Sequence, residues 1–133
     1  MKHAGEIGVS IRWTSIAIAL GVVVEIIVFQ RAAWFERIDP NRLLVFACAL
    51  AIPRWGFMWW GTSVGILVLA QALHGVTFGV FWLAVVRLVN AITPPDLSST
   101  GQSLLSTAVG GIGAVVGMYG ASWMVERYST VDY

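Results

Sequence analysis

Three ionisable side chains lie inside long apolar segments of this sequence: Glu25, Arg54 and His74. Moving a charge from water into hydrocarbon costs free energy, so such residues usually mark the path of a substrate, an ion or a proton. A guanidinium binds anions and polar solutes, and an imidazole beside a carboxylate can pass a proton. These residue types therefore indicate solute binding and proton exchange inside a membrane.

The composition of the chain also requires a membrane environment. Of the 133 residues, 58% are hydrophobic and 11% are charged, whereas a soluble domain carries about 25% charged residues. Lipid must therefore surround most of the chain, which predicts an integral protein of the cell (inner or plasma) membrane.

Several classes of function are not supported by the sequence. No run of Lys and Arg suggests nucleic acid, and the single Cys48 gives neither a disulfide nor a metal-ligand set. A Ser–His–Asp set, paired carboxylates in a cleft and a phosphate loop are also missing, so we expect no enzyme activity, no metal and no cofactor.

The elements that must position the three residues are helices long enough to cross a bilayer. The sequence predicts an all-α polytopic membrane helix bundle of four transmembrane helices, forming a single partial transmembrane domain over residues 1–133. The predicted spans are 13–30, 43–60, 64–91 and 103–125, joined by loops 31–42 and 92–99 at one face. Asp39 and Pro40 predict a helix start. Ser99 with Gln102 predicts a capping box before the fourth span.

The basic residues orient the bundle. One face carries four arginines and the other carries one lysine and two arginines, respectively Arg31, Arg37, Arg42 and Arg87, and Lys2, Arg12 and Arg127. Positive charge accumulates on the cytoplasmic side. The loops 31–42 and 92–99 are therefore predicted to be cytoplasmic and the termini extracytoplasmic.

Helix direction places the three ionisable residues at one depth. At 1.5 Å per residue, Glu25 lies about 18 Å from the outer end of its span, Arg54 about 17 Å from the inner end, and His74 about 15 Å from the outer end. We therefore expect all three near the midplane, where pairing would lower their desolvation cost. A charge cluster that only joins helices is the alternative interpretation.

The fourth predicted span is rich in glycine. Its small-residue stripe is formed by Gly110, Gly113, Gly117 and Gly120. Such a stripe lets two helices approach closely, so these positions are predicted to serve helix packing.

Four short motifs, at 20–25, 53–56, 71–78 and 101–104, occur in an order and spacing that resemble a known family. They are similar to the C-terminal half of major facilitator superfamily permeases of the lactose-permease-like and phenylpropionate-permease-like group. The resemblance implies that the spans correspond to helices eight to eleven of a twelve-helix transporter. It also implies that Arg37 and Arg42 belong to a basic cytoplasmic loop motif.

The same resemblance implies roles for individual residues. Arg54 and His74 match a charged pair that serves substrate binding and proton coupling. Thr77 stands where lactose-permease-like members have a proton-carrying Glu, so Glu25 or His74 would have to take that role. Trp55, Thr77 and Phe78 are further candidates to line a substrate site.

The predicted function is that of a fragment of a secondary active transporter. It would be a solute:proton symporter for a small organic solute such as a sugar, a nucleoside or an aromatic acid, with Glu25, Arg54 and His74 for substrate and proton. Its expected partners are the lipid bilayer, the missing N-terminal half or remaining helices, and the small-molecule substrate. The alternative is a small structural or accessory membrane protein whose buried charges serve helix assembly only.

Overall fold

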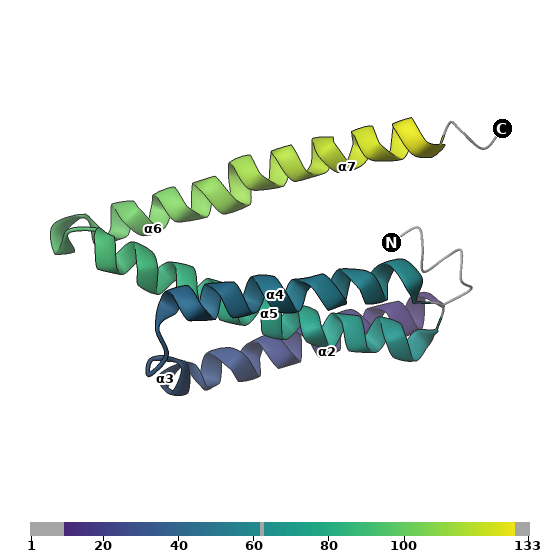
Figure 1. Cartoon of the computed structure of the whole chain (residues 1–133), viewed down its shortest axis with the longest axis horizontal. Helices are drawn as coiled ribbons and strands as arrows, with labels where there is room; N and C mark the ends of the chain where they lie inside the picture. The colour runs from purple at the N-terminus through teal and green to yellow at the C-terminus, as the bar shows by residue number, and fades with distance from the viewer. Residues whose placement is uncertain (1–9, 62, 130–133) are drawn as a thin grey trace. The chain divides into compact units, whose positions relative to one another are not determined.

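The computed structural model describes residues 10–61 and 63–129, and the regular elements of this part are helices. In chain order they are α2 (Ile11–Gln30), α3 (Ala32–Phe35), α4 (Pro40–Trp60), α5 (Val64–Ile92), η1 (Pro95–Leu97), α6 (Ser98–Ser106), η2 (Thr107–Gly113) and α7 (Ala114–Ser129) (Figure 1). Four helical stretches of this part are long and apolar enough to cross a membrane. The predicted all-α bundle of four spans is thereby confirmed.

The chain divides into two compact units, Met1–Leu88 and Val89–Tyr133. In the first unit, α2, α4 and α5 lie side by side and alternate in direction (Figure 1). Their shared core is small and is made of Val28, Leu43, Ala47, Val80 and Ala84. A small core suffices because the outer faces of membrane helices meet hydrocarbon, where apolar side chains are favourably solvated.

Glycines set the contact between α2 and α5. A Cβ atom on Gly75 would collide with the carbonyl oxygen of Gly21 and lie 2.9 Å from Cβ of Val24. One turn further, a Cβ on Gly79 would lie 2.9 Å from Cγ1 of Val28. Neither distance leaves room for a side chain, so the two backbones touch directly, as in other small-residue helix pairs. We call Gly21, Gly75 and Gly79 the glycine seam.

Helix α4 begins with the N-terminal cap that the sequence predicts at Asp39. Oδ1 of Asp39 accepts hydrogen bonds from the backbone N–H groups of Asn41, at 3.0 Å, and Arg42, at 3.2 Å. These bonds satisfy two donors that the first helical turn leaves free. Pro40 occupies the first turn, where no N–H is required. Helix α4 therefore begins at Pro40, as the Asp39 and Pro40 pair predicts, and before the predicted membrane span starts at residue 43. It continues through Pro53.

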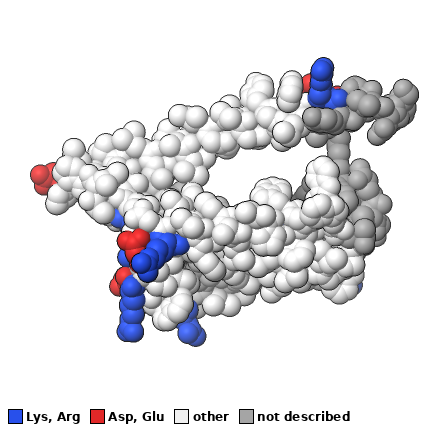
Figure 2. All heavy atoms as spheres, viewed as in Figure 1, with Lys and Arg blue, Asp and Glu red and all other residues white. Residues whose placement is uncertain are grey.

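Charged side chains gather where α3 joins α2 to α4. Figure 2 shows the blue and red atoms of the first unit concentrated at this end, with the sides of its helices almost entirely uncharged. The exposed charged residues here are Arg31, Glu36, Arg37, Asp39 and Arg42. This separation of charge from the helix sides is the pattern expected of spans whose ends meet water.

In the second unit, the end of α5 packs against α6. A Cβ on Gly101 would lie 2.6 Å from Oγ1 of Thr93, and Nε2 of Gln102 donates to Oδ1 of Asn90 at 2.7 Å. Gln102 therefore holds α6 against α5 as well.

The predicted capping box is wrong. Helix α6 begins at Ser98, its N-cap residue Leu97 makes no side-chain cap, and the carbonyl of Ser99 accepts from Oγ of Ser103 at 2.9 Å. Ser99 thus lies inside the helix. The short 3₁₀ turn η1, which begins with Pro95, leads the chain into the helix where a capping side chain was expected.

The fourth span contains a π-helix that the sequence pattern did not predict. Residues Thr107–Gly113 follow this geometry, between α6 and α7. A π-helix bonds i to i+5 and is rare in this length. Three of its seven residues are glycine, namely Gly110, Gly111 and Gly113. A Cβ on Gly110, Gly117 or Gly120 would meet no atom within 4 Å, so the packing role of this stripe stays a prediction.

Candidate functional site

The first unit has a pocket of about 190 Å³ between α4 and α5 that contains both Arg54 and His74. Its other lining residues are Ala47, Cys48 and Ala51 from α4, and Thr77, Phe78 and Phe81 from α5. The two helices run in opposite directions, so residues twenty apart in sequence face one another across this space. The expected juxtaposition of Arg54 with His74 is therefore present in the structure.

Arg54 lacks a polar partner. Its Nε atom is enclosed, and within the described residues nothing accepts a hydrogen bond from it. The guanidinium carbon lies 4.6 Å from the centre of the Trp55 ring, a distance at which a cation is attracted to the ring face. An enclosed donor without an acceptor costs about 1–3 kcal/mol, more when it is charged. The guanidinium therefore has hydrogen-bonding capacity that the described residues do not use.

His74 begins a row of aromatic rings along α5. Its ring centre lies 5.5 Å from that of Phe78, which lies 6.0 Å from that of Trp82 in an edge-to-face arrangement. These residues are spaced four apart, so they share one helix face. Phe78 therefore gives the pocket an apolar wall beside Arg54 and His74, whereas Trp82 lines a different pocket.

Thr77 is buried, and its hydroxyl donates to the carbonyl of His74 at 3.0 Å. The hydroxyl proton therefore forms a hydrogen bond within α5, while the lone pairs of the oxygen can still accept hydrogen bonds. A hydroxyl does not titrate near neutral pH, so Thr77 cannot replace a carboxylate as a proton carrier.

The position of Glu25 differs from the predicted one beside Arg54 and His74. It is absent from the residues that line the pocket, and no ion pair or hydrogen bond within the described part of the chain joins it to Arg54 or His74. Its backbone nitrogen would lie 3.0 Å from a Cβ on Gly75, so the glycine seam holds it against α5.

The expected burial of these charges is also wrong. Glu25, Arg54 and His74 are each partly exposed, and Thr77 is the one buried polar or charged residue in the part of the chain that the structure describes. The rise per residue of a helix fixes the position of a side chain along the helix axis but not its direction around that axis. Helices α2, α4 and α5 alone therefore do not enclose the three side chains.

The remaining predicted site residues fall into two groups. Phe78 lines the pocket, whereas Trp55 does not and stacks on Arg54 from outside. Arg37 and Arg42 are exposed at the α3 end of the unit. Cys48 was not among the predicted site residues, although it lines the pocket together with Phe81. Their spacing from Arg54 and His74 on the same helix faces was the available signal.

Within residues 10–61 and 63–129, no three His, Cys, Asp or Glu side chains gather in a way that could hold a metal ion. The pocket instead combines a cation, an imidazole, a hydroxyl oxygen and aromatic rings. Such a set can bind a small polar or anionic organic molecule and orient its apolar part.

Comparison with known proteins identifies the family and a relative of this chain. A model described as the MFS_1 like family matches residues 3–132. The chain is 29% identical over 102 residues to a protein of Escherichia coli (strain K12) named "Probable 3-phenylpropionic acid transporter". This match covers 76% of the chain and 27% of the relative's length, so the chain spans about a quarter of that protein. No solved structure matches the chain.

Proposed function

Since this chain belongs to the MFS_1 like family, of the major facilitator superfamily, we propose that it supplies part of a secondary transporter for a small organic anion. The pocket between α4 and α5 is one side of the substrate site. Arg54 binds the anionic group, His74 lies beside it, and Phe78 contacts the apolar part of the solute.

The observation that carries this proposal is the guanidinium of Arg54, which lies in the pocket wall beside His74 and whose Nε–H has no acceptor among the described residues. A guanidinium presents its donors in a planar fork that matches a carboxylate, and the charge raises the strength of each hydrogen bond. Of the three solute classes that the sequence suggested, the aromatic acid therefore fits better than the sugar or the nucleoside. The printed name of the bacterial relative supports the same class.

Proton coupling would use groups near Arg54. Imidazole is the side chain whose ordinary pKa lies closest to neutral pH, and His74 shares the pocket with Arg54. Thr77 cannot carry a proton, so His74 and Glu25 are the two candidates within this unit. The transporter is then a solute:proton symporter in which a proton and an anion enter together.

The partners and orientation follow from the same proposal. Transport by alternating access requires helices on both sides of a central site, so this chain would act with the remaining helices of the transporter in a cell membrane. The end of the first unit that carries α3 and its arginines would face the cytoplasm, and the chain termini the opposite side.

The test measures uptake of labelled 3-phenylpropionate, and the accompanying proton movement, in membranes that hold this chain together with the rest of its transporter. Arg54→Ala should abolish substrate binding, while Glu25→Gln and His74→Ala should abolish substrate-driven proton uptake. Arg31→Gln, which changes an exposed arginine outside both the pocket and the predicted loop motif, is the matched control. Undiminished coupled uptake in the three site variants would disprove the assignment and favour an accessory protein whose charges serve assembly.

A further inference from the structure

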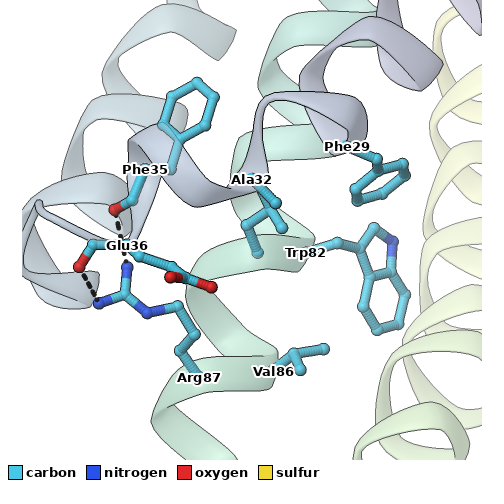
Figure 3. A pocket seen from close by; sticks show the side chains of 8 residues that line it. Phe29, Ala32, Phe35, Glu36, Trp82, Val86 and Arg87 are labelled. Atoms are coloured by element: carbon cyan, nitrogen blue, oxygen red, sulfur yellow. Dashed lines mark hydrogen bonds between the residues drawn. The ribbon is translucent and has the colours of Figure 1, made fainter.

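Arg87 joins the end of α5 to a connector that lies far away in sequence. Its Nη1 atom donates to the carbonyl oxygens of Phe35 and Ile38, both at 3.0 Å, and Nη2 donates to that of Glu36 at 3.2 Å. Figure 3 shows the guanidinium pointing at the connector, with the bonds to Phe35 and Glu36 drawn. One side chain therefore binds three backbone groups of the segment that links α2 to α4. We call this arrangement the Arg87 clamp.

The connector needs such a donor. Helix α3 spans only Ala32–Phe35, so its last carbonyls have few partners within the helix. The carbonyl of Phe35 accepts from the backbone N–H of Ile38 at 3.0 Å and still has a second lone pair, which Arg87 uses. A positive charge at a helix C-terminus is also favoured by the helix dipole.

Apolar side chains surround the clamp on one side. They line a pocket of about 390 Å³ whose walls include Phe29, Trp82, Leu83 and Val86, with Glu36 and Arg87 at the polar side (Figure 3). The two bonds from Nη1 are partly buried and the bond from Nη2 is exposed. Together they attach α5 to the connector.

The clamp and the candidate site lie on the same two helices. The connector leads through Asp39 into α4, which carries Arg54, while Arg87 and His74 share α5. Between the two places, Leu43 and Ala47 of α4 share one buried core with Val80 and Ala84 of α5. Packed helices move as rigid bodies, so a shift of the connector along α5 would move Arg54 relative to His74.

We propose that Arg87 is a positioning residue for the transport site: by holding the connector, it sets the offset of α4 along α5 and hence the distance between Arg54 and His74. The effect of Arg87 on transport rests on the proposed function, whereas its effect on the packing of α4 against α5 does not. The clamp acts whether or not the pocket binds substrate.

The structural part is tested by cross-linking in membranes. The native Cys48 of α4 and a cysteine introduced as Phe81→Cys on α5 both lie in the pocket wall and can be joined by a short bifunctional maleimide. Arg87→Gln should lower the cross-linking rate at least about threefold, because it removes a charged group that makes three hydrogen bonds. Arg87→Lys should give an intermediate rate, since one ammonium cannot match the planar fork.

Arg37→Gln is the control, because it removes an exposed arginine of the connector that is not a clamp residue. Equal cross-linking rates in Arg87→Gln, Arg37→Gln and the parent would overturn the clamp. If Arg87→Gln does not accumulate in the membrane, the folded Arg87→Lys variant decides the question by the same comparison.

Transport kinetics provide the second measurement. A displaced site predicts a raised KM for 3-phenylpropionate in Arg87→Lys, whereas a smaller amount of intact protein would lower the maximal rate and leave KM unchanged. A slower cross-link with an unchanged KM would overturn the assignment of the pocket as the transport site, and not the role of Arg87 in placing α4 on α5. The two failures are therefore distinguishable.

Discussion

The guanidinium of Arg54 lies over the ring of its neighbour Trp55, with 4.6 Å between Cζ and the ring centre. The ring is 61% exposed and does not line the pocket. Arg54 therefore contacts an aromatic face as well as lining the pocket that contains His74. This arrangement orients the side chain without neutralising it.

Removing the ring should weaken substrate binding. A cation–π contact at an exposed position contributes about 0.5–1 kcal/mol, so Trp55→Leu should raise the Kd for 3-phenylpropionate about two- to fivefold. Trp55→Phe should fall between this variant and the parent. Trp59→Leu removes a 78% exposed tryptophan of the same helix and serves as the control in an equilibrium binding measurement. Identical Kd values for all four proteins would contradict this role of the ring.

The glycine seam should tolerate no side chain at its centre. Gly75→Ala places a Cβ atom against the backbone of Gly21, and overpacking of this kind costs about 1–3 kcal/mol. We expect a lower midpoint of thermal unfolding for the chain in detergent micelles. Gly117→Ala adds the same methyl group where no atom lies within 4 Å and should leave the midpoint nearly unchanged. A Gly75→Ala midpoint equal to that of the parent would show that the helices do not touch there.

The Asp39 cap can be tested by proteolysis, because trypsin cleaves after arginine and Arg42 lies in the first turn of α4. Loss of a capping side chain costs about 1 kcal/mol, so Asp39→Ala should speed cleavage after Arg42 about fivefold by fraying this turn. Asp39→Asn keeps an accepting oxygen and should be cleaved at the parent rate. The opposite order of the two rates would be incompatible with the hydrogen bonds from Asn41 and Arg42.

The π-helix of the fourth span should exchange its amide hydrogens faster than the α-helical turns on either side. Its hydrogen-bond pattern is less stable, and its glycines favour open states. In Gly111→Ala the new Cβ would lie 3.8 Å from Cγ2 of Thr107, an ordinary contact. This variant should slow exchange in Thr107–Gly113 about fivefold, from a gain of about 1 kcal/mol.

Gly120→Ala lies outside the π-helix and controls for general stiffening of the span. Hydrogen exchange read by mass spectrometry or NMR distinguishes the segments. Uniform exchange along α6, η2 and α7 in the parent would argue against a distinct π segment.

Local chemistry explains what could be predicted from the sequence. Apolar length determines which segments cross a bilayer, and the cap at Asp39 depends on residues within three positions of it. The depths of Arg54 and His74 followed from the fixed rise of a helix, whereas their pairing was implied by the family resemblance. The all-α bundle therefore needed no knowledge of the packing.

Rotation about the helix axis and the choice of partner helix could not be predicted in this way. The backbone nitrogen of Glu25 lies at the contact with Gly75, and its side chain does not line the pocket. The glycines of the fourth span matched a packing pattern, while the contact that the structure describes uses Gly21 and Gly75 from other helices. A stripe on one helix does not identify the helix that meets it.

The Arg87 clamp and the π-helix were missed for a related reason. As one arginine among several near a membrane face, Arg87 contributed to orientation, and nothing in its sequence neighbourhood indicated three carbonyl groups about fifty residues away. The π-helix differs from an α-helix by a single-residue shift in bonding, which the apolar pattern of Thr107–Gly113 cannot resolve.

The glycine seam also limits how the sequence of this protein can change during evolution. At Gly21, Gly75 and Gly79 the neighbouring backbone or side chain leaves space for a hydrogen atom alone, so selection has one acceptable residue type at each position. Related chains that keep this helix pair should therefore retain glycine at all three positions, even where their solutes differ. Changes of specificity must then arise on α4 and on the other faces of α5, because the α2–α5 contact has no freedom to vary.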